Sequence, residues 1–154
     1  RVAASWVERG SRSDLKITFE GAYHGPAVGR PGHIQQVLMN LVQNAADAMA
    51  GQADAEVTLR LHSDAGREMI DICDNGPGVP EELTAAIFDP FFTTKDVGAG
   101  TGLGLAISAK IVEEHGGTLE LLPQESGACF RVALRRAEAG KDTGRDAGKG
   151  TEPE

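Results

Sequence analysis

The sequence has only two cysteines among its 154 residues, and they form no pattern typical of a metal site or a redox motif. Cys73 and Cys129 stand far apart in the chain, and neither belongs to a C-x-x-C pair. This spacing argues against a zinc site and fits a protein of a reducing compartment. We therefore interpret both cysteines as small, buried strand residues rather than as a redox switch.

Basic residues and long apolar runs are also scarce. Lys and Arg number 15 against 23 Asp and Glu, and the resulting net charge of -8 argues against a nucleic acid partner. A buried, local phosphate site is compatible with this balance. No apolar run approaches the roughly 20 residues of a membrane span, and we expect no signal peptide in these residues. The first residue is Arg1, so we expect a piece of a longer protein.

The spacing of apolar residues predicts one domain that mixes helices with strands. Helical spacing predicts a short helix near residues 2–9 and long helices over 33–50 and 103–115, while Pro80 and two acids open a short helix to about Phe88. Alternating patterns predict strands over 14–20, 55–64, 67–74, 118–124 and 128–136. The expected fold is an α/β (α+β) two-layer sandwich, whose mixed, largely antiparallel sheet is packed on one face by three helices.

One face of the helix over 33–50 is polar but almost uncharged. Within about 80° of arc it carries His33, Gln36, Asn40, Gln43, Asn44 and Asp47. A solvated face that happens to use amides is one interpretation, and a face covered by a ligand is the other. An asparagine carbonyl is a hard, neutral oxygen that suits Mg²⁺, which takes few protein ligands and completes its shell with waters and phosphates. Asn44 is the best placed candidate.

Two further stretches each allow a structural and a functional interpretation. Asp74 ends a strand and is followed by Asn-Gly-Pro-Gly, which is a turn by default. The same carboxylate could accept a hydrogen bond from an exocyclic amine such as that of adenine. The stretch GAGTGLG at 98–104 precedes a helix, and it is either a flexible surface loop or a helix start that exposes amides to phosphate.

Four stretches in fixed order, NLVQNAADAM, DNGPGV, IFDPFFTTK and GTGLGLAI, closely resemble the N, G1, F and G2 boxes of sensor histidine kinases. These boxes belong to their catalytic ATP-binding domain, in the superfamily that also holds gyrase and the mismatch-repair ATPases. The resemblance covers roughly residues 33 to 134 and is greatest to the nitrogen-regulation and dicarboxylate-sensor branch. It implies a Bergerat-type ATP-binding fold, with ATP between the first long helix and a mobile lid.

The resemblance assigns roles to individual residues. Asn44 matches the Mg²⁺ ligand, and Asn40 stands where ATP-hydrolysing relatives carry a glutamate that activates water. Because an amide cannot take that proton, the site is expected to keep ATP for transfer. Asp47 replaces a basic residue common in these kinases, so Lys95 is the candidate cation for the γ-phosphate, unless it is a solvated lid lysine. Asn40, Asn44 and Lys95 are the predicted catalytic residues.

Asp74 matches the aspartate that binds adenine, with Gly76 and Gly78 shaping that side of the pocket. The glycines of the last box correspond to Gly100, Gly102 and Gly104, which bring backbone amides to the phosphates. The full predicted nucleotide-binding set is Asn44, Asp47, Asp74, Gly76, Gly78, Thr94, Lys95, Gly100, Thr101, Gly102, Leu103 and Gly104. The cofactors implied are ATP and Mg²⁺.

The phosphoacceptor histidine of such a kinase is not found in this chain, because none of the four histidines is followed by the usual acid and later proline. We expect it on an upstream dimerising hairpin, with residues 1–13 as the end of the connection, 14–136 as the catalytic domain and 137–154 as a disordered tail. Phe91 or Phe92 could dock those partner helices, whereas Phe88 fits local core.

The expected protein is cytoplasmic, or anchored to the membrane through other segments. The fragment is expected to be a monomer, the full-length protein a homodimer, and a response regulator an indirect partner. The competing hypotheses are an ATP-hydrolysing conformational switch like gyrase, and a regulatory nucleotide-binding module or serine kinase.

Overall fold

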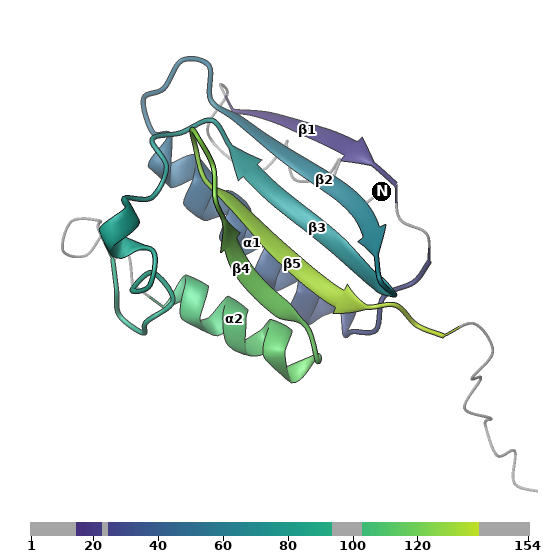
Figure 1. The fold of residues 1–154 in the computed structure, drawn as a ribbon. Coiled ribbons are helices and arrows are strands. Elements are labelled where there is room, and N and C mark those ends of the chain that lie inside the picture. Colours follow the sequence, from purple (N-terminus) through teal and green to yellow (C-terminus); the bar gives the residue numbers. More distant parts are fainter. Residues whose placement is uncertain (1–14, 23–24, 94–102, 139–154) are drawn as a thin grey trace, which may run out of the picture.

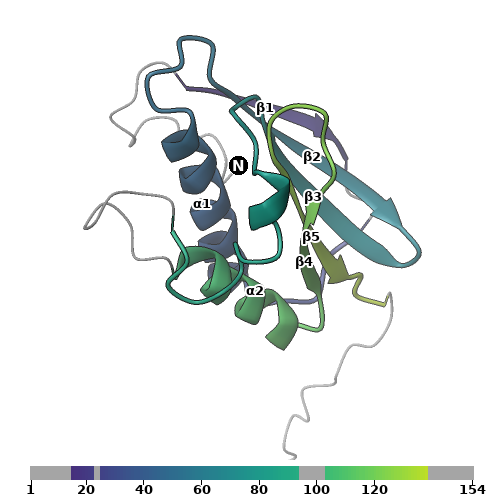
Figure 2. The same ribbon diagram turned by 60° about the vertical axis from the view of Figure 1, so that its left-hand side comes forward.

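The computed structural model describes residues 15–22, 25–93 and 103–138, and it forms one five-stranded sheet with helices on one face (Figures 1 and 2). The elements in chain order are β1 (Lys16–Gly21), α1 (Pro31–Ala48), β2 (Glu56–Asp64), β3 (Arg67–Asp74), the 3₁₀ helix η2 (Glu81–Leu83), α2 (Gly104–Glu114), β4 (Thr118–Leu122) and β5 (Cys129–Arg135). The two-layer sandwich predicted from the sequence is therefore confirmed. The predicted helix near residues 2–9 and most of the tail lie outside the described residues.

The sheet has the order β1-β2-β3-β5-β4 and is antiparallel except for its first pair. β1 runs parallel to β2, and α1 forms the crossover between them. β2 and β3 form a hairpin whose turn residues, Ala65 and Gly66, have φ angles of 48° and 76°. Two positive φ angles in a two-residue loop match the twist of the flanking strands. This topology places the end of β3 next to the start of β5.

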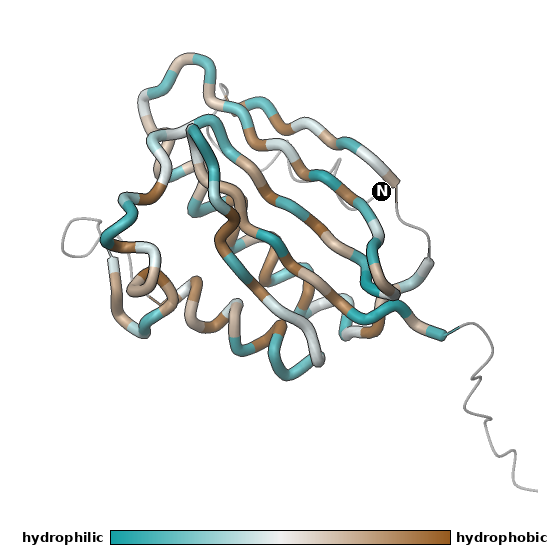
Figure 3. Tube along the Cα trace, viewed as in Figure 1, coloured by the Kyte–Doolittle hydropathy of each residue, from teal (hydrophilic) through white to brown (hydrophobic). Residues whose placement is uncertain are grey.

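The core lies between the sheet and the two long helices. Strand residues alternate between the two faces, and the side chains of Val57, Ile72 and Val132 are buried toward the helices. α1 contributes Val37 and Leu41 at helical spacing to the same core. Figure 3 shows the resulting alternation of hydrophobic and hydrophilic positions along the strands. This packing turns the apolar stripe of α1 toward the sheet.

The third predicted helix is shorter than expected. The sequence predicts a helix from Pro80 to about Phe88, but only Glu81–Leu83 form a 3₁₀ helix, and turns follow. The Thr84 hydroxyl donates to the Glu81 carbonyl at 2.8 Å, and the Ala86 N–H donates to the Leu83 carbonyl at 2.9 Å. Such local bonds compete with the regular α-helical pattern. The segment is thus a turn that packs its apolar residues under one end of the sheet.

The two cysteines are bonded to each other, a pairing that their spacing in the sequence did not predict. Cys73 and Cys129 are directly paired in the register of β3 and β5, and a disulfide joins them with their Cα atoms 4.0 Å apart. Both stand on strands, as predicted. Their pairing was missed because 56 residues separate them in sequence, and only the β3–β5 register brings them together.

A buried ion pair stabilises the sheet on the face away from the helices. Asp71 is only 3% exposed, and its two carboxylate oxygens accept hydrogen bonds from Arg131 at 2.7 and 2.8 Å. His62 lies 3.0 Å from the same carboxylate. Burial raises the pKa of Asp71, but the hydrogen bonds and charges of Arg131 and His62 together hold its pKa below the ordinary value. Asp71 is therefore ionised and depends on Arg131.

We expect Arg131→Met to lower the free energy of unfolding by about 3–5 kcal/mol, because it leaves a buried carboxylate without its main partner. Urea unfolding at neutral pH measures this loss. Since the pKa of Asp71 is lowered by folding, the wild-type stabilisation is complete above the ordinary aspartate pKa and is lost as the pH falls through the folded-state value.

The matched control is Arg60→Met, which removes an arginine from the exposed pair with Glu20, each side chain being 51% exposed. That change should cost less than about 1 kcal/mol. Equal losses in the two variants would contradict a special role for the Asp71 pair.

Candidate functional site

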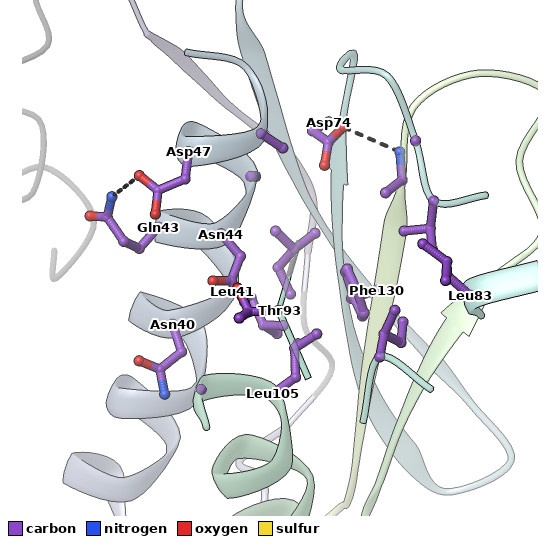
Figure 4. Close-up of a pocket in the computed structure, with 18 of the residues that line it drawn as sticks. Asn40, Leu41, Gln43, Asn44, Asp47, Asp74, Leu83, Thr93, Leu105 and Phe130 are labelled. Atoms are coloured by element: carbon purple, nitrogen blue, oxygen red, sulfur yellow. Dashed lines mark hydrogen bonds between the residues drawn. The ribbon is translucent and has the colours of Figure 1, made fainter. Parts of the chain in front are cut away.

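A cavity of about 610 Å³ opens between α1 and the sheet, where β3 ends and β5 begins. The segment from Gly78 to Thr93 lines another side, and the start of α2 closes the lower end (Figure 4). The polar lining comes mainly from α1 and from Asp74, while the floor is apolar. The cavity thus joins parts of the chain that are far apart in sequence.

The α1 wall contributes four polar residues of the predicted stripe to the cavity lining, Asn40, Gln43, Asn44 and Asp47. Asn44 is half-buried, and its amide has no hydrogen-bond partner among the described residues. Asp47 accepts a hydrogen bond from Gln43 at 2.9 Å, one turn earlier on the helix. A half-buried amide without a protein partner is a group available to a ligand or a cation. The stripe is therefore a cavity wall and not an ordinary solvated face.

Asn40 is held by the other long helix. Its Nδ2 donates to the hydroxyl of Ser108 at 3.2 Å, and Ser108 is fully buried on α2. The amide nitrogen therefore points toward α2, as Figure 4 shows. This bond ties the wall of the cavity to the helix that follows the segment over 94–102. Sequence patterns did not predict the contact with Ser108, because a serine within an apolar helix pattern is not recognisable as a site residue.

Asp74 stands on the opposite side of the cavity, at the end of β3. Its Oδ1 accepts hydrogen bonds from the backbone N–H of Gly76 at 2.9 Å and of Ala128 at 3.2 Å. Oδ2 makes no hydrogen bond within the described part of the chain. Burial raises the pKa of this carboxyl, although the two backbone hydrogen bonds partly offset it. One oxygen is thus fixed by the fold, and the other is left for a ligand.

Gly127 allows the close contact that holds Asp74. A Cβ atom at this position would lie 1.9 Å from the Asp74 carbonyl oxygen, and the φ angle of 71° also favours glycine. Gly78, with a φ of 77°, lines the cavity nearby. Gly127 and Ala128 were not among the predicted residues, since their contact with Asp74 depends on the β3–β5 pairing.

The floor beside Asp74 is apolar. It is formed by Ile72, Leu83, Ile87, Phe92, Leu105, Ala128 and Phe130. A slot of aliphatic and aromatic side chains with one hydrogen-bonding carboxylate at its end suits a flat heterocycle that carries an amine. This part of the cavity matches the adenine site expected from the sequence.

The charged side chains in the described lining of the cavity are acidic, so a bound polyphosphate would need an accompanying cation. Among the described lining residues, the ionisable ones are Asp47 and Asp74, both acidic, and no Lys or Arg is present. A polyphosphate would meet negative charge there unless a cation accompanied it. The unpartnered carbonyl oxygen of Asn44 suits Mg²⁺, which binds few protein oxygens together with phosphates and waters. The residues present therefore fit a magnesium-bound phosphate chain.

The start of α2 is the other feature suited to phosphate. Gly104 and Leu105 line the cavity, and Leu103, at the N-cap, provides no side-chain hydrogen bond to the first turn. Amides at the first turn of an 11-residue helix face an anion favourably because of the helix dipole. The position of the helix start is that expected from the glycine-rich stretch.

The structure brings six predicted site residues to one cavity: Asn40, Asn44, Asp47, Asp74, Gly78 and Gly104. Gly76 and Leu103 are outside the lining but adjoin it, through the hydrogen bond to Asp74 and as the residue before α2. Thr94, Lys95, Gly100, Thr101 and Gly102 lie outside the described residues, so their roles stay predictions.

Comparison with known proteins shows the family of the chain that forms this cavity. The family model described as "Histidine kinase-, DNA gyrase B-, and HSP90-like ATPase" matches residues 29–138. The chain belongs to this family. The match covers α1, the cavity and every strand except β1. The resemblance stated from the four motifs is thereby confirmed.

Several bacterial sensor proteins are similar to this chain in sequence. The chain is 40% identical over 111 residues to the C4-dicarboxylate transport sensor protein DctB of Rhizobium meliloti, covering 72% of this chain and 18% of that protein. It is 40% identical over 143 residues to the sensory histidine kinase/phosphatase NtrB of Rhizobium leguminosarum, covering 83% and 37%. The chain thus spans well under half the length of these relatives.

Solved structures agree with this family. The nucleotide-free catalytic domain of the histidine kinase ThkA superposes with a TM-score of 0.75 at 33% identity, covering 88% of each chain. Full-length ShkA in complex with AMPPNP superposes with a TM-score of 0.71 at 26% identity, covering 90% of this chain and 29% of that one. The chain is thus the ATP-binding catalytic domain of a histidine kinase. Within the described part, no helix of this kinase domain has the length and hydropathy needed to cross a membrane.

Proposed function

We propose that this domain binds Mg-ATP and transfers its γ-phosphate to a histidine on a separate dimerising helical domain. The observation that carries the proposal is the pairing of two unsatisfied groups across one cavity, the Asn44 amide and the Asp74 Oδ2. Asn44 and Asp74 are 30 positions apart in the sequence, and the fold brings both to the lining of one cavity. A histidine kinase catalytic domain needs both groups, one for the metal-bound phosphates and one for the base.

In this proposal each residue has a defined task. The adenine lies on the apolar floor, and its amine donates to Asp74 Oδ2. Asn44 supplies an oxygen to Mg²⁺, which neutralises the phosphate oxygens when it is bound. The first amides of α2, together with Lys95 and the glycines of the segment over 94–102, complete the phosphate site. Transfer forms a bond from phosphorus to a histidine nitrogen and breaks the bond to the β,γ-bridging oxygen, so that ADP leaves.

Asn40 favours transfer over hydrolysis. The amide nitrogen donates to Ser108, so the side chain offers only a weakly basic carbonyl oxygen to the cavity. A carbonyl of this kind does not accept a proton from water at neutral pH, whereas a carboxylate at the same position could. ATP is therefore expected to persist in the site until an acceptor histidine arrives.

The experiment is a calorimetric titration of the chain with Mg-ATP, followed by incubation with a separately supplied histidine-bearing helical hairpin from the same kinase. We expect saturable, EDTA-sensitive binding and phosphate on the hairpin only when both parts are present. Steady phosphate release by the chain alone would instead favour the ATP-hydrolysing switch. Absence of Mg-ATP binding would contradict the proposal.

Phe91 is the residue of the F-box region best exposed for docking the acceptor domain. It is 74% exposed with a φ of 66°, whereas Phe92 lines the cavity and Phe88 packs edge-on against Phe130. The structure thus separates the three phenylalanines, and the interpretation of Phe88 as core is supported. An exposed aromatic ring in a conformation unfavourable for its residue type is typical of a contact surface.

Replacing Phe91 with asparagine, which tolerates a positive φ, is expected to slow phosphotransfer to the supplied hairpin about tenfold. The affinity for Mg-ATP should stay within about twofold, because the ring does not line the cavity. Radiolabel transfer and nucleotide titration measure the two quantities. Phe19→Asn on β1, where the ring is 48% exposed, is the control and should change neither quantity.

By the same inference the full-length protein is a homodimer, the fragment is a monomer, and the domain acts on the cytoplasmic side, where ATP is available. A response regulator is expected to receive the phosphate from the histidine. ThkA has been solved in complex with its response regulator protein TrrA, and the chain superposes on that ThkA with a TM-score of 0.69 at 30% identity. The boundaries at residues 13 and 136 stay predictions.

A further inference from the structure

The disulfide lies next to the aspartate proposed to bind adenine. Cys73 directly precedes Asp74 at the end of β3, and Cys129 directly follows Ala128 at the start of β5. The two residues adjoining the disulfide are therefore the two that meet at the rim of the cavity.

Asp74 and Ala128 exchange two hydrogen bonds. The Asp74 N–H donates to the Ala128 carbonyl at 2.8 Å, and the Ala128 N–H donates to Asp74 Oδ1 at 3.2 Å. The second bond orients the carboxylate so that Oδ2 faces the cavity. The disulfide is one residue away in each strand, so a change in the separation of β3 and β5 there changes the length of the hydrogen bond from Ala128 to Asp74.

The two cysteines differ in exposure. Cys129 is 1% exposed, whereas Cys73 is half-buried. Cys73 is therefore the more accessible of the two to a small disulfide from solution. In a reducing compartment, a disulfide in a mesophilic protein is usually transient and serves catalysis or redox sensing.

We propose that Cys73 and Cys129 form a redox modification site that controls the affinity for adenine nucleotide. The proposal rests on the proposed function, because it requires ATP to bind beside Asp74. The oxidant is a low-molecular-weight disulfide such as oxidised glutathione. The Cys73 thiolate attacks it and releases one small thiol; Cys129 then attacks the sulfur of Cys73 in the mixed disulfide and releases the second. Two protein thiols and one small disulfide become one protein disulfide and two small thiols, which take up the two protons.

The oxidised form binds adenine more tightly. Non-bonded heavy atoms need a separation of roughly 3.5–4 Å, whereas a disulfide holds its sulfurs about 2 Å apart. Reduction removes the covalent link between the end of β3 and the start of β5. The two sulfurs then move apart by rotation of the half-buried Cys73 side chain or by separation of the strand ends, so the strand ends separate more often than in the oxidised form. The bond from Ala128 to Asp74 then lengthens, and the carboxylate is less often in the orientation that accepts the adenine amine. A binding-competent fraction below one lowers the apparent affinity in proportion.

The first test follows the thiols of the reduced chain during incubation with oxidised glutathione. These are the only two cysteines in the sequence, so thiol titration and intact mass report on them alone. We expect the wild type to lose both thiols and keep no glutathione, Cys129→Ser to stop at a stable glutathione adduct, and Cys73→Ser to stay unreacted. Retention of both thiols by the wild type, or equal adduct formation in the two variants, would overturn the proposal.

The second test compares Mg-ATP affinity of the wild-type chain after oxidation and after reduction by dithiothreitol, which needs no variant. We expect about three- to tenfold tighter binding in the oxidised form. Mg-tripolyphosphate, which lacks adenine, should bind equally to both, and the Cys73→Ser variant should show one affinity under both conditions. Equal Mg-ATP affinities in the oxidised and reduced wild type contradict this inference alone. Failure of both forms to bind Mg-ATP contradicts the proposed function and this inference with it.

Discussion

Replacing Asn44 with alanine is expected to abolish measurable Mg-ATP binding while leaving the domain folded. Asn44 is the residue of the α1 wall whose amide has no partner within the described chain, so no internal hydrogen bond is lost with it. Changes to groups that only support a metal ligand cost about 10–100-fold in affinity, and loss of the ligand itself costs at least as much. Calorimetric titration with Mg-ATP measures the loss, and urea unfolding checks the fold.

Gln35→Ala is the matched control for this prediction. Gln35 carries the same kind of amide on the same helix, but it is exposed and does not line the cavity. Its replacement should leave the Mg-ATP affinity unchanged. Unchanged affinity in the Asn44→Ala variant as well would remove Asn44 from the site, and with it the metal-binding role that the proposed function gives to α1.

Helical periodicity was sufficient to place the α1 side of the site. Asn40, Asn44 and Asp47 repeat at intervals of four and three residues, and a helix of this length must put them on one face. The apolar positions Val37 and Leu41 fix which face turns toward the sheet. The strand pattern likewise ended at Asp74, so the carboxylate could be expected at the rim of the sheet.

Strand pairing was not available from the same patterns. The contact of Ala128 with Asp74, the need for Gly127 and the disulfide all depend on the β3–β5 register, which joins residues more than 50 positions apart. The burial of Asp71 against Arg131 has the same origin, since alternation alone assigns both residues to a solvent-facing side. Local propensity also overestimated the helix after Pro80, where side-chain bonds to the backbone shorten it.

Replacing Asp74 with asparagine is expected to weaken Mg-ATP binding about 10–150-fold, the equivalent of a hydrogen bond to a charged group worth about 1.5–3 kcal/mol. The asparagine Oδ1 can still accept from the N–H groups of Gly76 and Ala128. Its Nδ2 takes the place of the acceptor Oδ2. Because Nδ2 and the adenine amine are both hydrogen-bond donors, no hydrogen bond forms between them. Titrations with Mg-ATP, Mg-ITP and Mg-tripolyphosphate measure the effect. ITP carries a carbonyl where ATP has the amine, so its affinity should fall less or rise, and that of tripolyphosphate should not fall.

The stability of the Asp74→Asn variant distinguishes a residue that binds adenine from a residue that only stabilises the turn. Because burial raises its pKa in the folded state, Asp74 favours the folded state only while protonated, and its contribution is lost as the pH rises through the folded-state pKa. At neutral pH the ionised carboxylate therefore destabilises the nucleotide-free domain. The Asp74→Asn variant should unfold at the same or higher urea concentration than the wild type at pH 7, and this difference should shrink in acid.

The exposed Asp64, at the far end of β2, gives the charge-matched control. Asp64→Asn also removes one negative charge, and a purely electrostatic effect of that loss would strengthen the binding of a polyanion to a domain with a net charge of -8. A loss of Mg-ATP affinity in Asp74→Asn alone is therefore opposite in sign to the effect of removing a negative charge. It requires a direct contact between Asp74 and the nucleotide. Equal losses for Mg-ATP and Mg-ITP, or a loss of stability at pH 7, would instead make Asp74 a residue of the turn, and the adenine would have to bind elsewhere along the apolar floor.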